Sequence, residues 1–156
     1  MYKFFLNLII FVIISFQNQA FSIEEFKKNY SQVSFDVVEK ELIIDDNIPL
    51  YFKKLTKRWF DEKVKIDGFD GNMTFTLFGY NEKISIINSS KRIDASIKFQ
   101  IIINKPSLNS KEKIQGEVSS YGVITGSFSL NEFDDIIKST QVDLLDRIIK
   151  ELKLIN

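Results

Sequence analysis

The sequence predicts an α+β fold: one largely antiparallel four-stranded sheet, with elements in the order β-α-β-β-β-α and two long amphipathic helices on one face. Two observations carry this prediction. Apolar and polar residues alternate almost perfectly from Ile93 to Ile103, as in a strand with one buried and one wet face. Two stretches, near 49–64 and 129–155, instead repeat apolar residues at helical spacing.

The first 22 residues have the pattern of a secretory signal peptide. Lys3 precedes an apolar run from Phe4 to Phe16, and a small-residue cleavage site follows. The run is shorter than the roughly 20 residues that span a bilayer. We therefore expect cleavage, no transmembrane span afterwards, and a periplasmic or secreted protein whose residues 23–156 form a single domain. A retained membrane anchor is the alternative.

The residue pattern in the first half of this domain predicts a helix, a strand, a second helix and a turn, in that order. Capping-box spacing opens the first helix, alternation marks the strand, and Pro49 suits the first turn of the second helix. Trp59 lies on the apolar face of that helix, so we expect it in the core. The expected ranges are a short helix at 22–30, a strand at 33–44, a helix from Pro49 to about Val64 and a turn at 67–72.

The second half predicts three strands in succession and a final helix. The strands are expected at 73–78, 93–103 and 114–128, with a β-bulge near 119–122 and polar hairpin loops at 81–91 and 106–111. Ser129 and Glu132 have capping-box spacing, and Phe128 and Phe133 stand where a hydrophobic staple would join them. This end of the chain is therefore the best specified helix start.

Composition excludes several function classes. The chain has no cysteine and no histidine, which removes disulfides, thiolate chemistry, Ser-His-Asp catalysis and the commonest zinc ligands. Lys and Arg together number 21, as do Asp and Glu, and this balance argues against a nucleic-acid partner and against broad electrostatic attraction to anionic lipid. We predict no cofactor, no metal site and no catalytic residue.

Three weaker patterns are better explained by ordinary structure. They are Asp67 with Asp70, which miss the ligand spacing of a calcium loop; Glu39 with Glu41, two carboxylates on one strand face; and the Ser90–Lys91 pair, considered as nucleophile and base. We interpret them as a turn, a solvated strand edge and a loop. Tyr80 and Tyr121, near strand ends, are candidates for the rim of a binding surface.

The predicted binding residues are a basic group on the first long helix: Lys53, Lys54, Lys57 and Arg58. Such a group binds an anionic lipid head group or a phosphate in some proteins. The alternative is the ordinary solvated face of an amphipathic helix.

Several short motifs resemble a group of small exported bacterial proteins of unassigned function. They are Val33–Val37, Trp59 ahead of Gly68 and Gly71, Met73–Leu77, Arg92–Ala95 and Leu130–Glu132. More distantly, the element order is similar to that of the LPS-assembly lipoprotein and of auxiliary lipoproteins in lipid-transport ABC systems. Those relatives carry a lipidated N-terminal cysteine that this chain lacks, so the resemblance does not extend to their membrane tether.

The sequence therefore favours an exported, non-enzymatic accessory protein of the bacterial cell envelope that binds a partner protein or a lipid, as the LPS-assembly resemblance implies. A His-independent enzyme using carboxylates, Tyr or Ser-Lys is one alternative. A structural module of an envelope complex is another.

Overall fold

The computed structural model describes residues 32–87 and 90–155, all within the unit Gln32–Asn156. The predicted signal peptide and the helix expected at 22–30 lie outside the described residues. The elements are β1 (Val33–Phe35), β2 (Glu39–Ile44), α2 (Leu50–Lys63), β3 (Val64–Ile66), β4 (Asn72–Ile87), β5 (Ser90–Lys105), the short 3₁₀ turn η1 (Pro106–Leu108), β6 (Ser110–Thr125) and α3 (Leu130–Ile155).

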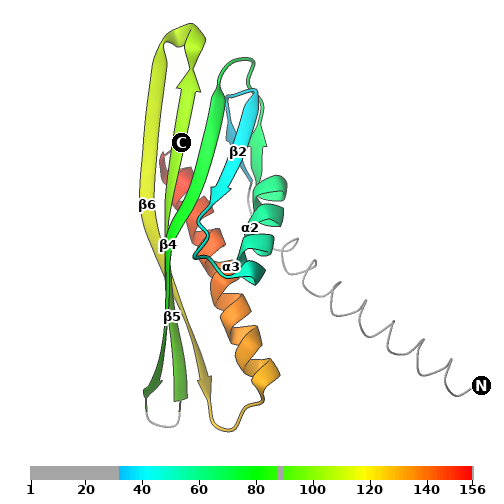
Figure 1. Ribbon diagram of the computed structural model, residues 1–156, viewed down its shortest axis with the longest axis vertical. Helices are drawn as coiled ribbons and strands as arrows, with labels where there is room; N and C mark the ends of the chain where they lie inside the picture. The colour runs from blue at the N-terminus through cyan, green and yellow to red at the C-terminus, as the bar shows by residue number, and fades with distance from the viewer. Residues whose placement is uncertain (1–31, 88–89, 156) are drawn as a thin grey trace, which may run out of the picture. The chain divides into compact units, whose positions relative to one another are not determined.

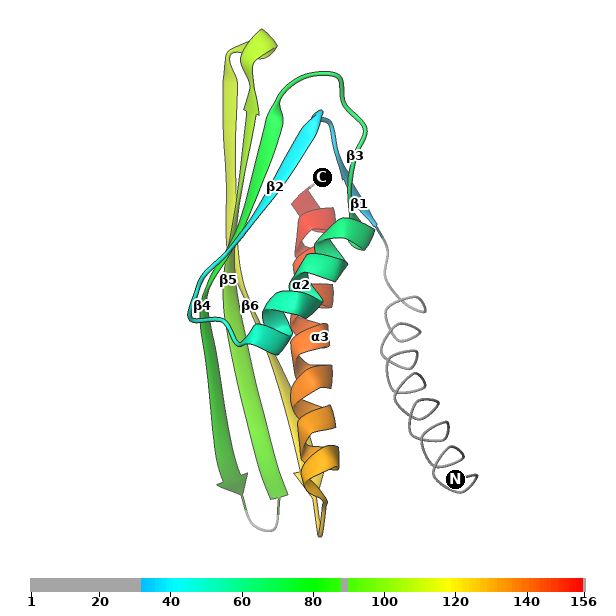
Figure 2. The ribbon, with the colours of Figure 1, turned by 45° about the vertical axis from the view of Figure 1, so that its right-hand side comes forward.

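The main sheet has four strands in the order β2-β4-β5-β6. Neighbouring strands are antiparallel except for β2 and β4, which run parallel because α2 and β3 connect them. Figures 1 and 2 show α2 and α3 on the same side of this sheet. The α+β class and the mostly antiparallel four-stranded sheet are thus confirmed.

A second, two-stranded sheet was not predicted. The stretch expected as one strand at 33–44 is two strands, because β1 leaves the main sheet and pairs in parallel with β3. The chain changes partners at Val37, which is buried, while Val38 N–H donates to Gly71 O at 3.1 Å. Gly68 packs so closely here that a β-carbon would lie 2.3 Å from the Val37 nitrogen.

The strands β4, β5 and β6 each run for 16 residues, so the loop predictions for 81–91 and 106–111 were wrong in extent. Polar residues continue the ladder there, as in the pair Lys83 and Asp94. The predicted bulge in β6 was also wrong, because β6 pairs with β5 without any shift. The irregularity lies in β4, between Phe78 and Asn81, where Gly79 has a φ of +61°.

The core lies between the helices and the sheet. The alternating row of β5 is buried along one face, and Trp59 of α2 meets Phe75 of β4 edge-on at 5.7 Å between ring centroids. The start of α3 is as predicted: Glu132 N–H donates to Ser129 Oγ at 3.2 Å, and the staple pair of phenylalanine rings stacks at 6.0 Å. From α3, the side chains buried in this core are Leu144, Leu145, Ile148, Ile149 and Leu152.

Candidate functional site

The exposed face of α2 carries the predicted basic residues, and the structure fixes this helix at both ends. Its first turn follows a tight turn in which Ile48 N–H donates to Asp45 O at 3.2 Å. At its C-terminal end, Lys40 Nζ of β2 donates to Phe60 O of the last turn at 3.2 Å and to Val64 O, just beyond the helix, at 2.5 Å. A cation at this end is favoured, because the helix dipole is negative there. Because contacts at both ends hold α2 in place, its polar face is held in a fixed position towards solvent.

The four predicted basic residues do not share one environment. Lys53 is drawn aside by Asp46, whose carboxylate lies 3.2 Å from the ammonium, and only 22% of its side chain is exposed. Lys54, Lys57 and Arg58 are exposed, and no ion pair joins them to any residue in 32–87 or 90–155. Because three and four residues separate neighbours on a helix surface, these three cations form one patch.

Two apolar side chains extend this patch, and the sequence analysis did not single them out. Leu50 is 69% exposed and Tyr51 is 43% exposed at the start of α2. Leu50 stands one turn before Lys54 on the same helix face, so helical spacing could have revealed it. Lys138 of α3 places its ammonium 5.7 Å from the Tyr51 ring centroid. We call Leu50, Tyr51, Lys54, Lys57 and Arg58 the α2 patch.

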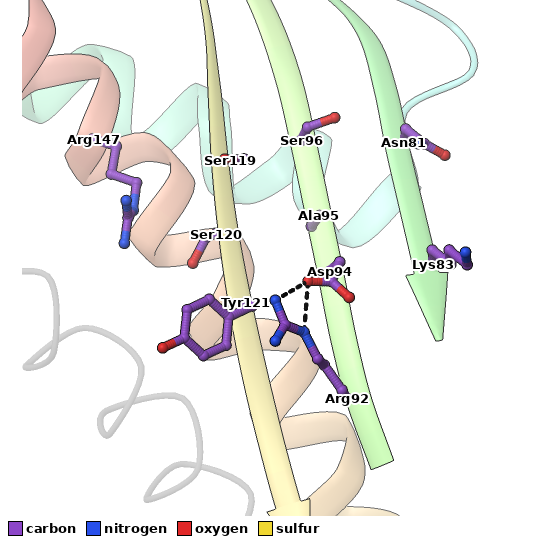
Figure 3. A pocket seen from close by; sticks show the side chains of 10 residues that line it. All are labelled: Asn81, Lys83, Arg92, Asp94, Ala95, Ser96, Ser119, Ser120, Tyr121 and Arg147. Atoms are coloured by element: carbon purple, nitrogen blue, oxygen red, sulfur yellow. Dashed lines mark hydrogen bonds and ion pairs between the residues drawn. The ribbon is translucent and has the colours of Figure 1, made fainter. Parts of the chain in front are cut away.

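A shallow hollow of about 390 Å³ lies elsewhere, on the strands β4, β5 and β6 beside α3 (Figure 3). Its lining carries three cations, Lys83, Arg92 and Arg147, and one carboxylate, Asp94. Arg92 holds that carboxylate through Nε at 2.8 Å and Nη2 at 2.7 Å, and its guanidinium lies 4.6 Å from the Tyr121 ring centroid. Tyr121 is 60% exposed, as expected of a rim residue.

The lining of this hollow does not provide the pair of carboxylates that acid–base catalysis uses. Catalysis by carboxylates uses two such groups in different environments, and the one carboxylate lining the hollow is neutralised by Arg92. The hydroxyl of Ser120 is likewise engaged, since it donates to Asp143 of α3 at 2.5 Å. Burial acts to raise the pKa of Asp143, but hydrogen bonds from Ser120 and Arg147 outweigh it and leave that pKa below its ordinary value.

The second tyrosine expected at a rim, Tyr80, is instead half-buried between the sheet and α3. Its hydroxyl donates to Glu82 at 2.5 Å and accepts from Gln141 Nε2 at 3.2 Å. Its ring also packs on Phe52 of α2, with 5.3 Å between centroids. Tyr80 therefore ties β4 to both helices.

The weaker sequence candidates are kept apart or engaged by the fold. Ser90 and Lys91 are consecutive strand residues and point to opposite faces, and the ammonium of Lys91 lies 4.9 Å from the Phe128 ring centroid. Asp70 accepts hydrogen bonds from the Ser107 hydroxyl and from Ser107 N–H, the latter at 3.1 Å, and these bonds, the hydroxyl's first, lower the pKa of Asp70. Within the described residues, no group of three Asp or Glu side chains is placed to hold a metal ion.

No helix within residues 32–87 and 90–155 is both long and apolar enough to cross a bilayer.

Comparison with known proteins finds similarity of fold only. No protein-family model matches the chain, and no curated protein matches it. Solved structures that it resembles include a minor lipoprotein from Acinetobacter baumannii (TM-score 0.48, 10% identity, 74% of this chain and 89% of that one). A second is the rare lipoprotein B from Shewanella oneidensis (TM-score 0.47, 14% identity, 74% of this chain and 94% of that one). A third is lipoprotein B from Nitrosomonas europaea (TM-score 0.47, 9% identity, 80% of this chain and 88% of that one). The expected distant resemblance to lipoproteins is thus found, and we draw no functional conclusion from it.

Proposed function

We propose that this chain is an exported accessory protein of the bacterial cell envelope, without catalytic activity, that binds anionic phosphorylated lipid through the α2 patch. The observation that carries the proposal is the patch itself. It joins three exposed cations, free of ion pairs within the described residues, to two exposed apolar side chains on one helix.

The chemistry of the patch fits the boundary between lipid head groups and acyl chains. Each Lys or Arg near an anionic membrane surface contributes about 1 kcal/mol of attraction. Exposed Leu and Tyr side chains gain free energy by entering the apolar side of the same boundary. The formal net charge of zero does not oppose this, because attraction within a Debye length of roughly 8 Å depends on local rather than total charge.

Export is the second part of the proposal, and the pattern of residues 1–22 supports it. The accessory, non-enzymatic role is supported by the lack of His and Cys in the sequence and by the engaged carboxylate in the hollow. An envelope protein with these properties would act by holding lipid or by presenting it to a partner.

The test is co-sedimentation with vesicles containing phosphatidylglycerol, with LPS as a second probe. The triple variant Lys54→Gln, Lys57→Gln, Arg58→Gln should bind about 100-fold more weakly, since three surface cations contribute roughly 3 kcal/mol. Moderate salt should weaken wild-type binding towards that level. Lys53→Gln alone should change binding little, because Asp46 already engages this residue.

A matched control makes the same change of charge elsewhere. Lys98, Lys111 and Lys113 are exposed on the sheet face opposite the helices, so their triple Gln variant should bind like wild type. Equal binding by all three proteins, or equal weakening by both triple variants, would reject the α2 patch as the lipid site.

A further inference from the structure

Beyond lipid binding, the structure leaves residues 78–87 of β4 without a strand partner, among the described residues, on the side away from β5. β2 covers only Asn72–Leu77 of β4, and the chain then turns away, with Asp45 N–H donating to Leu77 O at 2.9 Å. Within the described residues, no strand pairs with 78–87 on the side away from β5. Figure 2 shows this lower half of β4 as the outermost strand of the sheet. Its backbone N–H and C=O groups on that side form a template for another strand.

The other edge strand of the same sheet, β6, differs from this part of β4 in its charge and in its neighbours. β6 begins with Lys111, Glu112 and Lys113, and charged side chains on an edge strand oppose pairing with another chain. Further along, α3 packs on the helix-side face of β6, where a β-carbon at Gly122 would lie 2.5 Å from Ile136 Cγ2. The open part of β4 has only Glu82 and Lys83 as charged residues, and it ends in an apolar run.

The side chains along the open edge are exposed although they are large and apolar. Ile84 is 48% exposed, Ile86 is 74% exposed and Ile87 is 52% exposed. Ile84 and Ile86 lie on the helix side of the sheet, in register with Ile93 and Lys91 of β5. Pairing the edge would therefore satisfy the backbone and also shield part of the surface of these side chains from water.

We propose that a second copy of this chain occupies the edge, so that two β4 strands pair antiparallel about a two-fold axis. Keeping the helices of both copies on one side of the joined sheet places residues of the same face opposite each other. The register is set by the residue at the two-fold axis, which lies opposite its own copy. If that residue is Glu82 or Lys83, two like charges lie opposite each other, which is unfavourable. Centring the pair on Ile84 sets each Glu82 opposite an Ile86.

Centring the pair on Ser85 is the register that this edge favours. Each Ile84 then lies opposite Ile86 of the second copy, and each Lys83 lies opposite Ile87, where its carbon stem covers apolar surface. No charged residue in 83–87 faces another. β2 of each copy covers only residues 72–77 and so does not reach the paired stretch.

The register is tested by cross-linking, because the chain has no cysteine of its own. Directly opposite residues of antiparallel strands have α-carbons about 4.5–5.5 Å apart, which suits a disulfide. Ser85→Cys should form a disulfide-linked dimer under mild oxidation. Ser119→Cys, at an exposed serine on the same sheet face but on β6, should form no disulfide-linked dimer under the same conditions. Cross-linking of Ser119→Cys to the same or a greater extent would overturn the proposal.

A second measurement does not depend on cysteine chemistry. Sedimentation velocity of the purified protein should show a concentration-dependent dimer, and Ile86→Lys should raise its dissociation constant roughly tenfold or more. Ile43→Lys, at an isoleucine of β2 that is 44% exposed, should leave the dimer unchanged. At concentrations where the wild type is monomeric, both variants should melt like wild type, since both side chains are exposed in the single chain. A wild-type protein that stays monomeric at every concentration would also overturn the proposal.

Discussion

The substitution Lys40→Met tests how α2, which carries the proposed lipid patch, is held in place. Lys40 lies on β2, and its ammonium donates to Phe60 O in the last turn of α2 and to Val64 O directly after the helix, while lying 4.7 Å from the Phe60 ring centroid. Methionine keeps most of the apolar stem but removes the charge and the donors. The C-terminal end of α2 would then lose the side chain that binds these carbonyls.

The expected cost follows from these contacts. A hydrogen bond from a charged group is worth about 1.5–3 kcal/mol, and the cation–π contact adds about 0.5–1 kcal/mol. Phe60 O keeps a second donor, the Val64 N–H, so the main loss falls on Val64 O. We therefore expect Lys40→Met to lower the free energy of unfolding by about 2–4 kcal/mol and the Tm by roughly 8–16 °C.

The pH dependence gives an independent check with a defined sign. Burial lowers the pKa of Lys40 below its ordinary value of 10.5, against the opposing effect of Asp61. Between the lowered pKa and 10.5 the unfolded chain binds more protons, so Lys40 makes the wild type more stable as pH rises through this window. The free energy of unfolding of the wild type, measured in urea, should therefore exceed that of Lys40→Met by a growing margin as the pH rises towards 10.5.

The matched control is Lys98→Met, at an exposed lysine on the other face of the sheet, which should change stability by less than about 0.5 kcal/mol. A Lys40→Met variant as stable as this control would refute our account of how α2 is anchored.

Three further predictions concern packing and titration. Ile148→Ala should cost about 2–5 kcal/mol by leaving a cavity, because Ile148 is fully buried; an unchanged thermal melt would contradict this. Gly122→Ala should cost about 1–3 kcal/mol in urea unfolding, because its β-carbon would meet Ile136, whereas Ser119→Ala should be neutral. Burial and the bond to Glu82 raise the pKa of Tyr80 above 10, so stability should be lost as pH rises beyond 10. Tyr80→Phe should reduce this alkaline loss, and equal losses in both proteins would contradict the assignment.

Local patterns in the sequence were sufficient where one element meets water on one side and the core on the other. The alternation around Ile97, the helical spacing around Trp59 and the capping box at Ser129 each report a single element, and the structure confirms all three. The basic residues of α2 were found in the same way, because exposure on a helix follows its period.

Tertiary structure decided everything that depends on a partner strand. Residues 81–91 are polar enough for a loop, yet most of them continue two strands because each finds a backbone partner across the ladder. β1 separates from β2 because β3, formed directly after α2, supplies a neighbour. Lys53 does not belong to the basic patch, because a turn places the carboxylate of Asp46 beside its ammonium.

The sequence by itself determined the class of fold, the best specified helix and the chemistries that need His or Cys and are excluded. Only the tertiary structure decided which cations remain exposed together, which residues line the hollow and which half of β4 has, among the described residues, no strand on the side away from β5. The physical reason is that periodicity records one boundary between core and water, whereas pairing, register and ion pairs depend on residues that the fold brings together from distant positions.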